Sequence, residues 1–220
     1  MKVFQIGFNK CGTRSLHHLF ESAGYKCAHW EKGAIARDIG KSMTEGAEPL
    51  LAWPDVVLFS DMELLLPRKF GHFEGAKQFA YLHKCFPDAK FILNKRDVED
   101  WLFSRLDHNR GTYARNYRKH YELTSTRELF DHWRRDWEDH FSAVRSYFAP
   151  FPGTLFEFDI KNDPIDKLKE FFAPHLDLSK DEWAKIRSSK QFNAGQASKG
   201  ARAGKGKRGA ISSNMVAQAV

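Results

Sequence analysis

The chain of 220 residues alternates between short apolar runs and longer stretches in which apolar residues recur every three or four positions. Short runs of this kind are typical of buried strands, and periodic stretches are typical of amphipathic helices. The runs predict strands at residues 3–6, 25–30, 56–59, 90–95 and 154–158. The periodic stretches predict helices at residues 13–24, 31–47, 73–86, 97–106, 125–148 and 164–173.

This order of elements predicts the fold class. Strands that alternate with helices form a parallel sheet covered by helices on both faces. We therefore expect an α/β protein, a three-layer sandwich with a central parallel sheet and a P-loop-like phosphate-binding turn. Ligands of such sheets bind at the carboxyl ends of the strands. The segments that follow the strands are thus the first places to look for a functional site.

The segment after the first strand has the composition of an anion-binding turn, Gly-Phe-Asn-Lys-Cys-Gly-Thr-Arg-Ser-Leu at residues 7–16. Backbone N–H groups of such a turn and the positive end of the following helix converge on a phosphate. A loop that hydrolyses nucleoside triphosphates has lysine and Ser/Thr after its last glycine. Here Thr13 and Arg14 follow Gly12, and Lys10 lies inside the turn. This order favours a phosphate loop for another ligand over a strand–helix turn without one.

A second basic position, Arg96, follows the strand at residues 90–95 and precedes a helix with acids in its first turn. Arg96 offers a bidentate, permanently charged fork to a phosphate, and Ser104 offers a hydroxyl donor. Two helical turns separate them by roughly 12 Å at 1.5 Å per residue, so the chain must bend for both to meet one phosphate. The structural alternative is a surface arginine and an ordinary helix serine.

Together the two segments resemble the donor sites of sulfotransferases that use 3′-phosphoadenosine 5′-phosphosulfate (PAPS). The pattern Lys-x-Gly-Thr-x-Ser-Leu at residues 10–16 is similar to their 5′-phosphosulfate loop. Arg96 and Ser104 stand at the spacing of their 3′-phosphate site. The resemblance covers most of the chain in order, although only these two motifs are specific. It implies transfer of a sulfuryl group from PAPS to an acceptor, with 3′,5′-adenosine bisphosphate (PAP) as the other product.

The resemblance also implies roles for single residues. Lys10 would bind the donor and offset the negative charge that develops on the leaving oxygen, as preorganised donors do. The further donor-binding residues would be Cys11, Gly12, Thr13, Arg14, Ser15, Arg96 and Ser104. We expect no required metal, because neither the lysine–Ser/Thr ending of a nucleotide-hydrolysing loop nor a strand ending in Asp-x-x-Gly is present.

The transfer also needs a base for the acceptor hydroxyl. After the third strand the chain reads Phe-Ser-Asp-Met-Glu-Leu-Leu-Leu-Pro at residues 59–67. A histidine, glutamate or aspartate occupies this place in sulfotransferases, so the resemblance implies Asp61 as the base, with Glu63 second. An ordinary aspartate is a weak base at neutral pH, and burial would have to raise its pKa. Asp61 as a helix N-cap is the alternative.

The net charge of +7 is concentrated at the C-terminal end. Residues 183–220 include eight basic side chains and no acidic ones, so the rest of the chain has a net charge near −1. We expect a catalytic domain at 1–195 and a Gly/Lys-rich segment at 196–220. Lys199 and Gly200 resemble segments that close over the 3′-phosphate in several sulfotransferases. A flexible terminus and a nonspecific nucleic-acid patch remain alternatives.

The cysteines Cys11, Cys27 and Cys85 are odd in number and lack a framework spacing, which favours a reducing compartment. The Cys-x5-Arg pattern of phosphatase loops fails, because the sixth residue after Cys11 is His17. We therefore interpret Cys11 as structural. No signal peptide or long apolar run is present, so we expect a cytoplasmic protein without a membrane anchor.

The acceptor is the least determined part of the prediction. The basic, aromatic stretch at residues 105–121 would suit an acceptor pocket, although a polar surface loop has the same composition. His132, Asp136 and His140 share one helix face, which we interpret as a solvated face with ion pairs. We expect a small-molecule or carbohydrate acceptor with a hydroxyl or amine, and no specific nucleic acid. A noncatalytic nucleotide- or nucleic-acid-binding protein and a small phosphotransferase are the alternatives, and the oligomeric state stays open.

Overall fold

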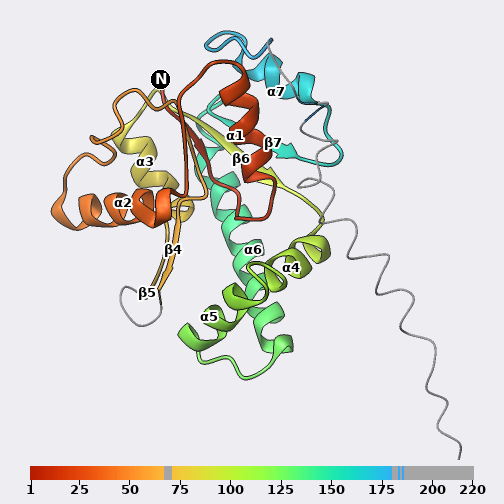
Figure 1. Ribbon diagram of the computed structural model, residues 1–220. Coiled ribbons are helices and arrows are strands. Elements are labelled where there is room, and N and C mark those ends of the chain that lie inside the picture. The colour runs from red at the N-terminus through yellow and green to blue at the C-terminus, as the bar shows by residue number, and fades with distance from the viewer. Residues whose placement is uncertain (67–70, 180–182, 184, 186–220) are drawn as a thin grey trace, which may run out of the picture.

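In the computed structural model, the described residues are 1–66, 71–179, 183 and 185. Five parallel strands form a central sheet in the order β2-β3-β1-β6-β7 (Figure 1). They are β1 (Val3–Gln5), β2 (Cys27–His29), β3 (Leu58–Ser60), β6 (Lys90–Lys95) and β7 (Leu155–Asp159). β1 lies in the middle, so the segment that follows it emerges between the ends of β3 and β6.

Helices cover both faces of the sheet. Successive strand residues point to opposite faces, and the strands accordingly contribute to two buried clusters. One cluster includes residues of α1 (Thr13–Ser22) and α7 (Ile165–Phe172), and the other residues of α2 (Ala34–Glu45), α3 (Phe79–Cys85) and α6 (Thr126–Phe148). The buried strand residues are Val3, Leu58, Ile92 and Phe158 in the first cluster and Phe4, Ala28, Phe59, Phe91 and Leu93 in the second. The predicted three-layer α/β fold is confirmed.

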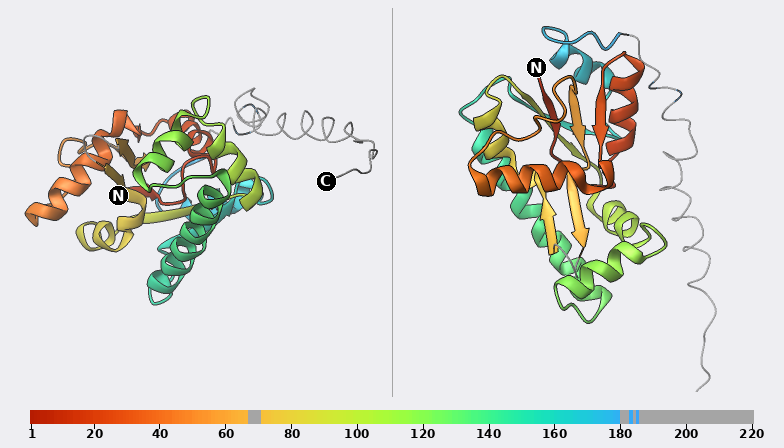
Figure 2. Two further views of the ribbon diagram at one scale, coloured as in Figure 1. Left: turned by 90° about the horizontal axis from the view of Figure 1, so that it is seen from below. Right: turned by 60° about the vertical axis from the view of Figure 1, so that its left-hand side comes forward.

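A second group of elements extends beyond the carboxyl ends of the strands. It comprises α4 (Val98–Leu106), α5 (Thr112–His120) and the antiparallel hairpin of β4 (Glu63–Leu66) and β5 (Gly71–Glu74), beside the first half of α6 (Figure 1). The hairpin projects from the sheet next to α2, as the right-hand view of Figure 2 shows. This group therefore borders the edge at which ligands of a parallel sheet bind.

Several predicted elements differ from the observed ones. The helix predicted at 73–86 begins at Phe79, because the residues before it form β5 and the 3-10 turn η2 (Gly75–Gln78). The period of the local sequence does not reveal a hairpin, because the pairing of β5 with β4 is not a property of either segment alone. The helix predicted at 31–47 begins with the 3-10 turn η1 (Glu31–Gly33). The aperiodic stretch at 105–121 includes the end of α4 and all of α5.

The solvated face predicted for His132, Asp136 and His140 is wrong. His140 is only 4% exposed, and its Nε2 is 2.7 Å from the carbonyl oxygen of Ile6. Asp136 is half-buried and pairs with Lys77. Helix α6 thus uses polar side chains on its inner face, where they find partners on other elements.

Within residues 1–66 and 71–179, no helix combines the length and hydropathy needed to cross a membrane. The expected boundary between residues 195 and 196 lies outside the described residues. The division of the chain at that point stays a prediction.

Candidate functional site

The phosphate loop at residues 7–12 connects β1 to α1, and a side chain from β6 binds both of its ends. The N–H of Gly7 donates to Asn94 Oδ1 at 3.0 Å, and Asn94 Nδ2 donates to the carbonyl of Cys11 at 2.8 Å. A Cβ atom on Gly7 would lie 2.0 Å from the Asn94 carbonyl oxygen, so only glycine permits this approach. Asn94 is completely buried. The loop is therefore held in one conformation by the neighbouring strand.

The N-terminus of α1 is open toward the loop. Gly12 precedes the helix with a φ of 80°, and no side chain caps the helix among the described residues. Thr13 and Ser15 are buried in the first turn, and Arg14 is exposed. Uncapped N–H groups and the helix dipole together form a site for a negatively charged group. This is the geometry that the loop sequence predicts.

Three basic side chains, Lys10, Arg14 and Arg96, surround this helix end, and we call them the loop cations. Arg96 Nη1 donates to the carbonyl of Lys10 at 3.1 Å, and the Arg96 side chain is 8% exposed. Lys10 has a φ of 67°, which directs the chain through a left-handed turn. Burial lowers the pKa of Lys10, and Arg14 and Arg96 lower it further, although the charge of Asp61 opposes them. Positive charge is therefore crowded at the mouth of the loop.

The thiol of Cys11 has no electrostatic activation. It is completely buried, and burial raises the pKa of this thiol to about 12. A thiol that stays protonated is a poor nucleophile. The structural interpretation of Cys11 agrees with this environment, and the cysteines Cys11, Cys27 and Cys85 are all free.

Asp61 lies directly after β3, at the same edge of the sheet as Lys10. Burial raises the pKa of its carboxyl group to about 7, and the neighbouring Glu63 raises it further. Lys10, Arg105 and Arg14 oppose this shift. The side chain is still 21% exposed, so an acceptor can reach it. The N-cap alternative for Asp61 is wrong, since the chain continues into the strand β4 and not into a helix.

Glu63, the second candidate base, already has several partners. Its Oε1 accepts from the hydroxyl of Tyr113 at 2.6 Å and lies 3.1 Å from His72 Nε2. Its Oε2 accepts from the Nδ2 of Asn9, a residue of the phosphate loop. Both carboxylate oxygens of Glu63 are therefore occupied by partners within the protein. Glu63 supports the loop through Asn9, and Asp61 remains the first candidate for the base.

Glu63 belongs to a buried charge cluster of six residues, Glu63, Glu74, Asp136, His72, Lys77 and Arg105. The cluster contains three cations and three carboxylates. Lys77, for example, contacts both Glu74 and Asp136. Burial disfavours the imidazolium of His72, but hydrogen bonds to Glu63 and Glu74 outweigh it and raise its pKa to about 11. The cluster is thus charged and internally neutral at physiological pH.

Arg105 is the centre of this cluster and connects it to the phosphate loop. The residue is completely buried, and its Nε donates to Asn9 Oδ1 at 2.8 Å. Its Nη2 donates to Tyr113 at 2.6 Å and to Glu74 at 3.2 Å. The guanidinium also lies 4.7–5.4 Å from the centres of five aromatic rings, those of Phe8, Trp101, Tyr113, Tyr117 and Trp133.

Ligand atoms of Glu63, His72 and Glu74 lie within 4.8 Å of one another, a spacing that a metal ion could occupy. The charges do not favour this use. Arg105 and Lys77 approach Glu74 at 3.2 and 2.8 Å and already neutralise its carboxylate. A metal ion would have to compete with two protein cations, so this donor set does not fit one.

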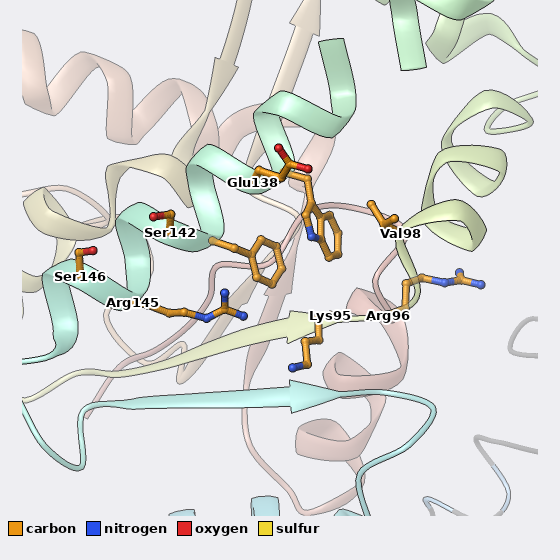
Figure 3. A pocket seen from close by; sticks show the side chains of 9 residues that line it. Lys95, Arg96, Val98, Glu138, Ser142, Arg145 and Ser146 are labelled. Atoms are coloured by element: carbon orange, nitrogen blue, oxygen red, sulfur yellow. The ribbon is translucent and has the colours of Figure 1, made fainter. Parts of the chain in front are cut away.

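Two open cavities of about 510 and 520 Å³ flank the site without including the loop. The first is lined by Lys95, Arg96 and residues of α6 (Figure 3). In Figure 3 the Arg96 guanidinium points away from Arg145 and Lys95. Arg96 is therefore directed to the phosphate loop, whose Lys10 carbonyl it binds. The second cavity lies at the turn between α4 and α5.

The structure brings together Lys10, Arg14, Arg96 and Asp61, but it leaves two predictions open. Ser104 is half-buried on α4 and makes no hydrogen bond to Arg96 within the described part of the chain. Lys199 and Gly200 lie outside the described residues. Sequence reasoning missed the buried supports Asn9, Asn94 and Arg105, because their partners are distant in the sequence and no local motif marks them.

A family model of the sulfotransferase domain matches residues 2–145. The match begins before the phosphate loop and extends through most of α6, so it includes both phosphate segments and Asp61. A search of curated proteins found no match.

Proposed function

The chain belongs to the sulfotransferase domain family, and on this premise we propose that its phosphate loop binds PAPS. The observation that carries the proposal is the crowding of Lys10, Arg14 and Arg96 around the uncapped end of α1. Burial lowers the pKa of Lys10, and the charges of Arg14 and Arg96 lower it further against the opposing charge of Asp61. A bound anion of high charge would relieve the repulsion among the three cations.

The two phosphate groups of the donor have separate partners in this proposal. The loop N–H groups, Thr13, Arg14 and Ser15 hold the 5′-phosphosulfate, whose charge the helix dipole favours. Arg96 binds the 3′-phosphate, and its Nε has no hydrogen-bond partner among the described residues. Ser104, Lys199 and Gly200 would complete this part of the site. A 3′-phosphate subsite distinguishes PAPS from ATP.

The donor supplies an activated sulfuryl group, and the residues of the chain assist its transfer. Asp61 takes the proton from the acceptor while the acceptor oxygen or nitrogen bonds to sulfur in line with the leaving group. Lys10 stabilises the negative charge that develops on the oxygen between sulfur and the 5′-phosphate. The pKa of Asp61 is raised to about 7, so its carboxylate can accept a proton efficiently at neutral pH.

The acceptor is a small molecule or carbohydrate in this proposal. Asp61, β4, β5 and α5 border the same edge of the sheet, and Trp30, which follows β2 at this edge, has an exposed ring. Rings of sugars and phenols pack on aromatic faces. The free cysteines agree with the reducing compartment that their number predicts.

Sulfur-labelled PAPS tests this function directly. The protein is incubated with the donor, a panel of phenols, amines and sugars, and a chelator of divalent ions. We expect label on an acceptor and stoichiometric release of PAP, with a loss of about 100-fold or more in Lys10→Met. Lys41→Met, which changes an exposed lysine of α2, is the matched control. Consumption of ATP with magnesium, without any transfer from PAPS, would contradict the proposal.

A further inference from the structure

The carboxylate of Asp61 has a histidine neighbour without a role in the proposed reaction. His29 ends β2 and lies directly opposite Ser60 in the parallel pairing with β3. Its Nε2 is 3.5 Å from Asp61 Oδ2, and its Nδ1 is 2.9 Å from Ser60 Oγ. Two adjacent strands thus place a serine, a histidine and an aspartate in a continuous chain at the carboxyl edge of the sheet.

The contacts of Ser60 favour one tautomer of His29. The buried Ser60 hydroxyl lies 3.4 Å from the carbonyl oxygen of Ala28, to which it can donate its one proton. The hydroxyl then accepts from His29, which places the proton of the neutral imidazole on Nδ1. The lone pair of Nε2 is consequently directed to Asp61. In this arrangement Nε2 can accept a hydrogen bond from a neutral Asp61 carboxyl group but cannot donate one to an ionised carboxylate.

We propose, on the basis of the function inferred above, that His29 is a positioning residue that stabilises the protonated form of Asp61 during sulfuryl transfer. The acceptor oxygen or nitrogen bonds to sulfur while its proton moves to the Asp61 carboxylate. The bond between sulfur and the 5′-phosphate oxygen breaks, and its electron pair leaves with PAP. The neutral carboxyl group then donates through Oδ2 to His29 Nε2, which strengthens Asp61 as a base.

The surrounding charges agree with this pairing. Burial lowers the pKa of His29 to about 4 and raises that of Asp61 to about 7, so the shared proton resides on Asp61. The groups that act on His29 are His17, Arg14 and His18, which lower its pKa, and Glu21, which raises it. Those that act on Asp61 are Glu63, which raises its pKa, and Lys10, Arg105 and Arg14, which lower it.

NMR titration of the full chain tests the proposal without an acceptor. Labelled aspartate carboxyl carbons report the pKa of Asp61, with Asp61→Asn to assign the signal, and labelled imidazole nitrogens report the tautomer of His29. We expect the Nδ1–H tautomer at neutral pH and a fall in the Asp61 pKa in His29→Phe. A phenyl ring excludes water as well as imidazole does, so burial alone would hold or raise that pKa. An unchanged or raised pKa, or the Nε2–H tautomer, overturns the proposal.

Two milder variants decide the question if His29→Phe does not fold. His29→Gln retains an oxygen that can accept from Asp61 and should keep most of the raised pKa. Ser60→Ala removes the acceptor of Nδ1–H and should give His29 a mixture of tautomers, so an unchanged tautomer there contradicts the proposal. The control is His175→Gln, an exposed residue that follows α7, which should change neither signal.

Calorimetry with PAP separates this proposal from the function on which it rests. Wild-type protein that does not bind PAP contradicts the proposed function itself. Variants that bind PAP as tightly as the wild type, but show no fall in the Asp61 pKa, contradict only the role of His29.

Discussion

Two groups of cations contact the same phosphate loop, and they differ in how their charge is balanced. In the buried charge cluster, Arg105 is neutralised by Glu63 and Glu74, and it reaches the loop through Asn9. Among the loop cations, Arg14 and Arg96 repel Lys10 while Asp61 attracts it, and Arg96 lies 3.8 Å from Asp100, a carboxylate that Lys161 also contacts. The acids of the first group match its cations in number, whereas the three loop cations share these two carboxylates with Lys161 and leave room for the charge of a bound anion.

This difference explains why the two groups need different environments. A buried charge is tolerated only when it is paired and hydrogen-bonded. The cluster meets this condition with three cations and three carboxylates behind the loop. Among the loop cations Arg14 is exposed, and solvent weakens its repulsion of Lys10 and of the largely buried Arg96 side chain until a ligand binds. We infer that the cluster stabilises the loop and that the loop cations bind the donor.

Removal of a cation from the cluster should have the largest effect on stability. Arg105→Met leaves an excess of negative charge beside Glu63 and Glu74. We expect a loss of about 3–5 kcal/mol in the free energy of unfolding, measured by chemical denaturation. Lys10→Met is the comparison, because it removes a cation whose charge burial disfavours, and it should change stability by less than about 1 kcal/mol. Equal losses in the two variants would remove the distinction between the groups.

Removal of the base should affect turnover and leave donor binding intact. Asp61→Asn should lower kcat by about 100-fold with an acceptor found by the labelled-donor screen, because general base catalysis contributes at least this much. The affinity for PAP should stay nearly unchanged. Wild-type turnover in this variant would show that another group accepts the proton.

The same substitution should change how stability depends on pH. The pKa of Asp61 is about 7 in the folded protein and near 3.8 without its environment, so folding favours the protonated carboxyl group. Its contribution is therefore complete below about pH 4 and is lost as the pH rises to about 7. Relative to wild type, Asp61→Asn should gain on the order of 1–2 kcal/mol across this window, after allowance for partial exposure. If the free energy of unfolding depends on pH in the same way in Asp61→Asn and in wild type, the pKa of Asp61 is not raised in the folded protein.

An exposed ion pair should matter least. Glu99 and Arg134 approach at 2.7 Å, but their side chains are 51% and 37% exposed. Glu99→Gln should change the free energy of unfolding by less than about 1 kcal/mol, since exposed pairs are weak. A loss comparable to that of Arg105→Met would show that burial does not separate the two kinds of interaction.

The elements that depend on adjacent residues could be predicted from the sequence. The loop at residues 7–12 and the helix after it are specified locally, and so is the strand that ends before Arg96. Helix α6 begins one residue after its predicted start, at a Ser125 cap. Local order determines these features, because turns, caps and apolar periods act over a few residues.

The supports of the site could not be predicted, since they depend on pairing across the fold. Arg105 is 96 residues from Asn9 and 31 from Glu74. In the sequence it is one of many charged residues, which are usually exposed. The β4–β5 hairpin carries Glu63, His72 and Glu74 to Arg105, and the helix predicted at 73–86 overlaps the end of β5. The contact between His29 and Asp61 likewise depends on the pairing of two strands, so it could not be predicted from the sequence.

Calorimetry with PAP and with magnesium–ATP tests the central claim that the loop cations form a bisphosphate donor site. We expect the wild type to bind PAP more tightly than ATP, and Arg96→Ala to weaken PAP binding by about tenfold or more while ATP binding changes less. Arg127→Ala, which alters an exposed arginine at the start of α6, should bind PAP as the wild type does. Tighter binding of ATP, or PAP binding that is unchanged in Arg96→Ala, would contradict the account.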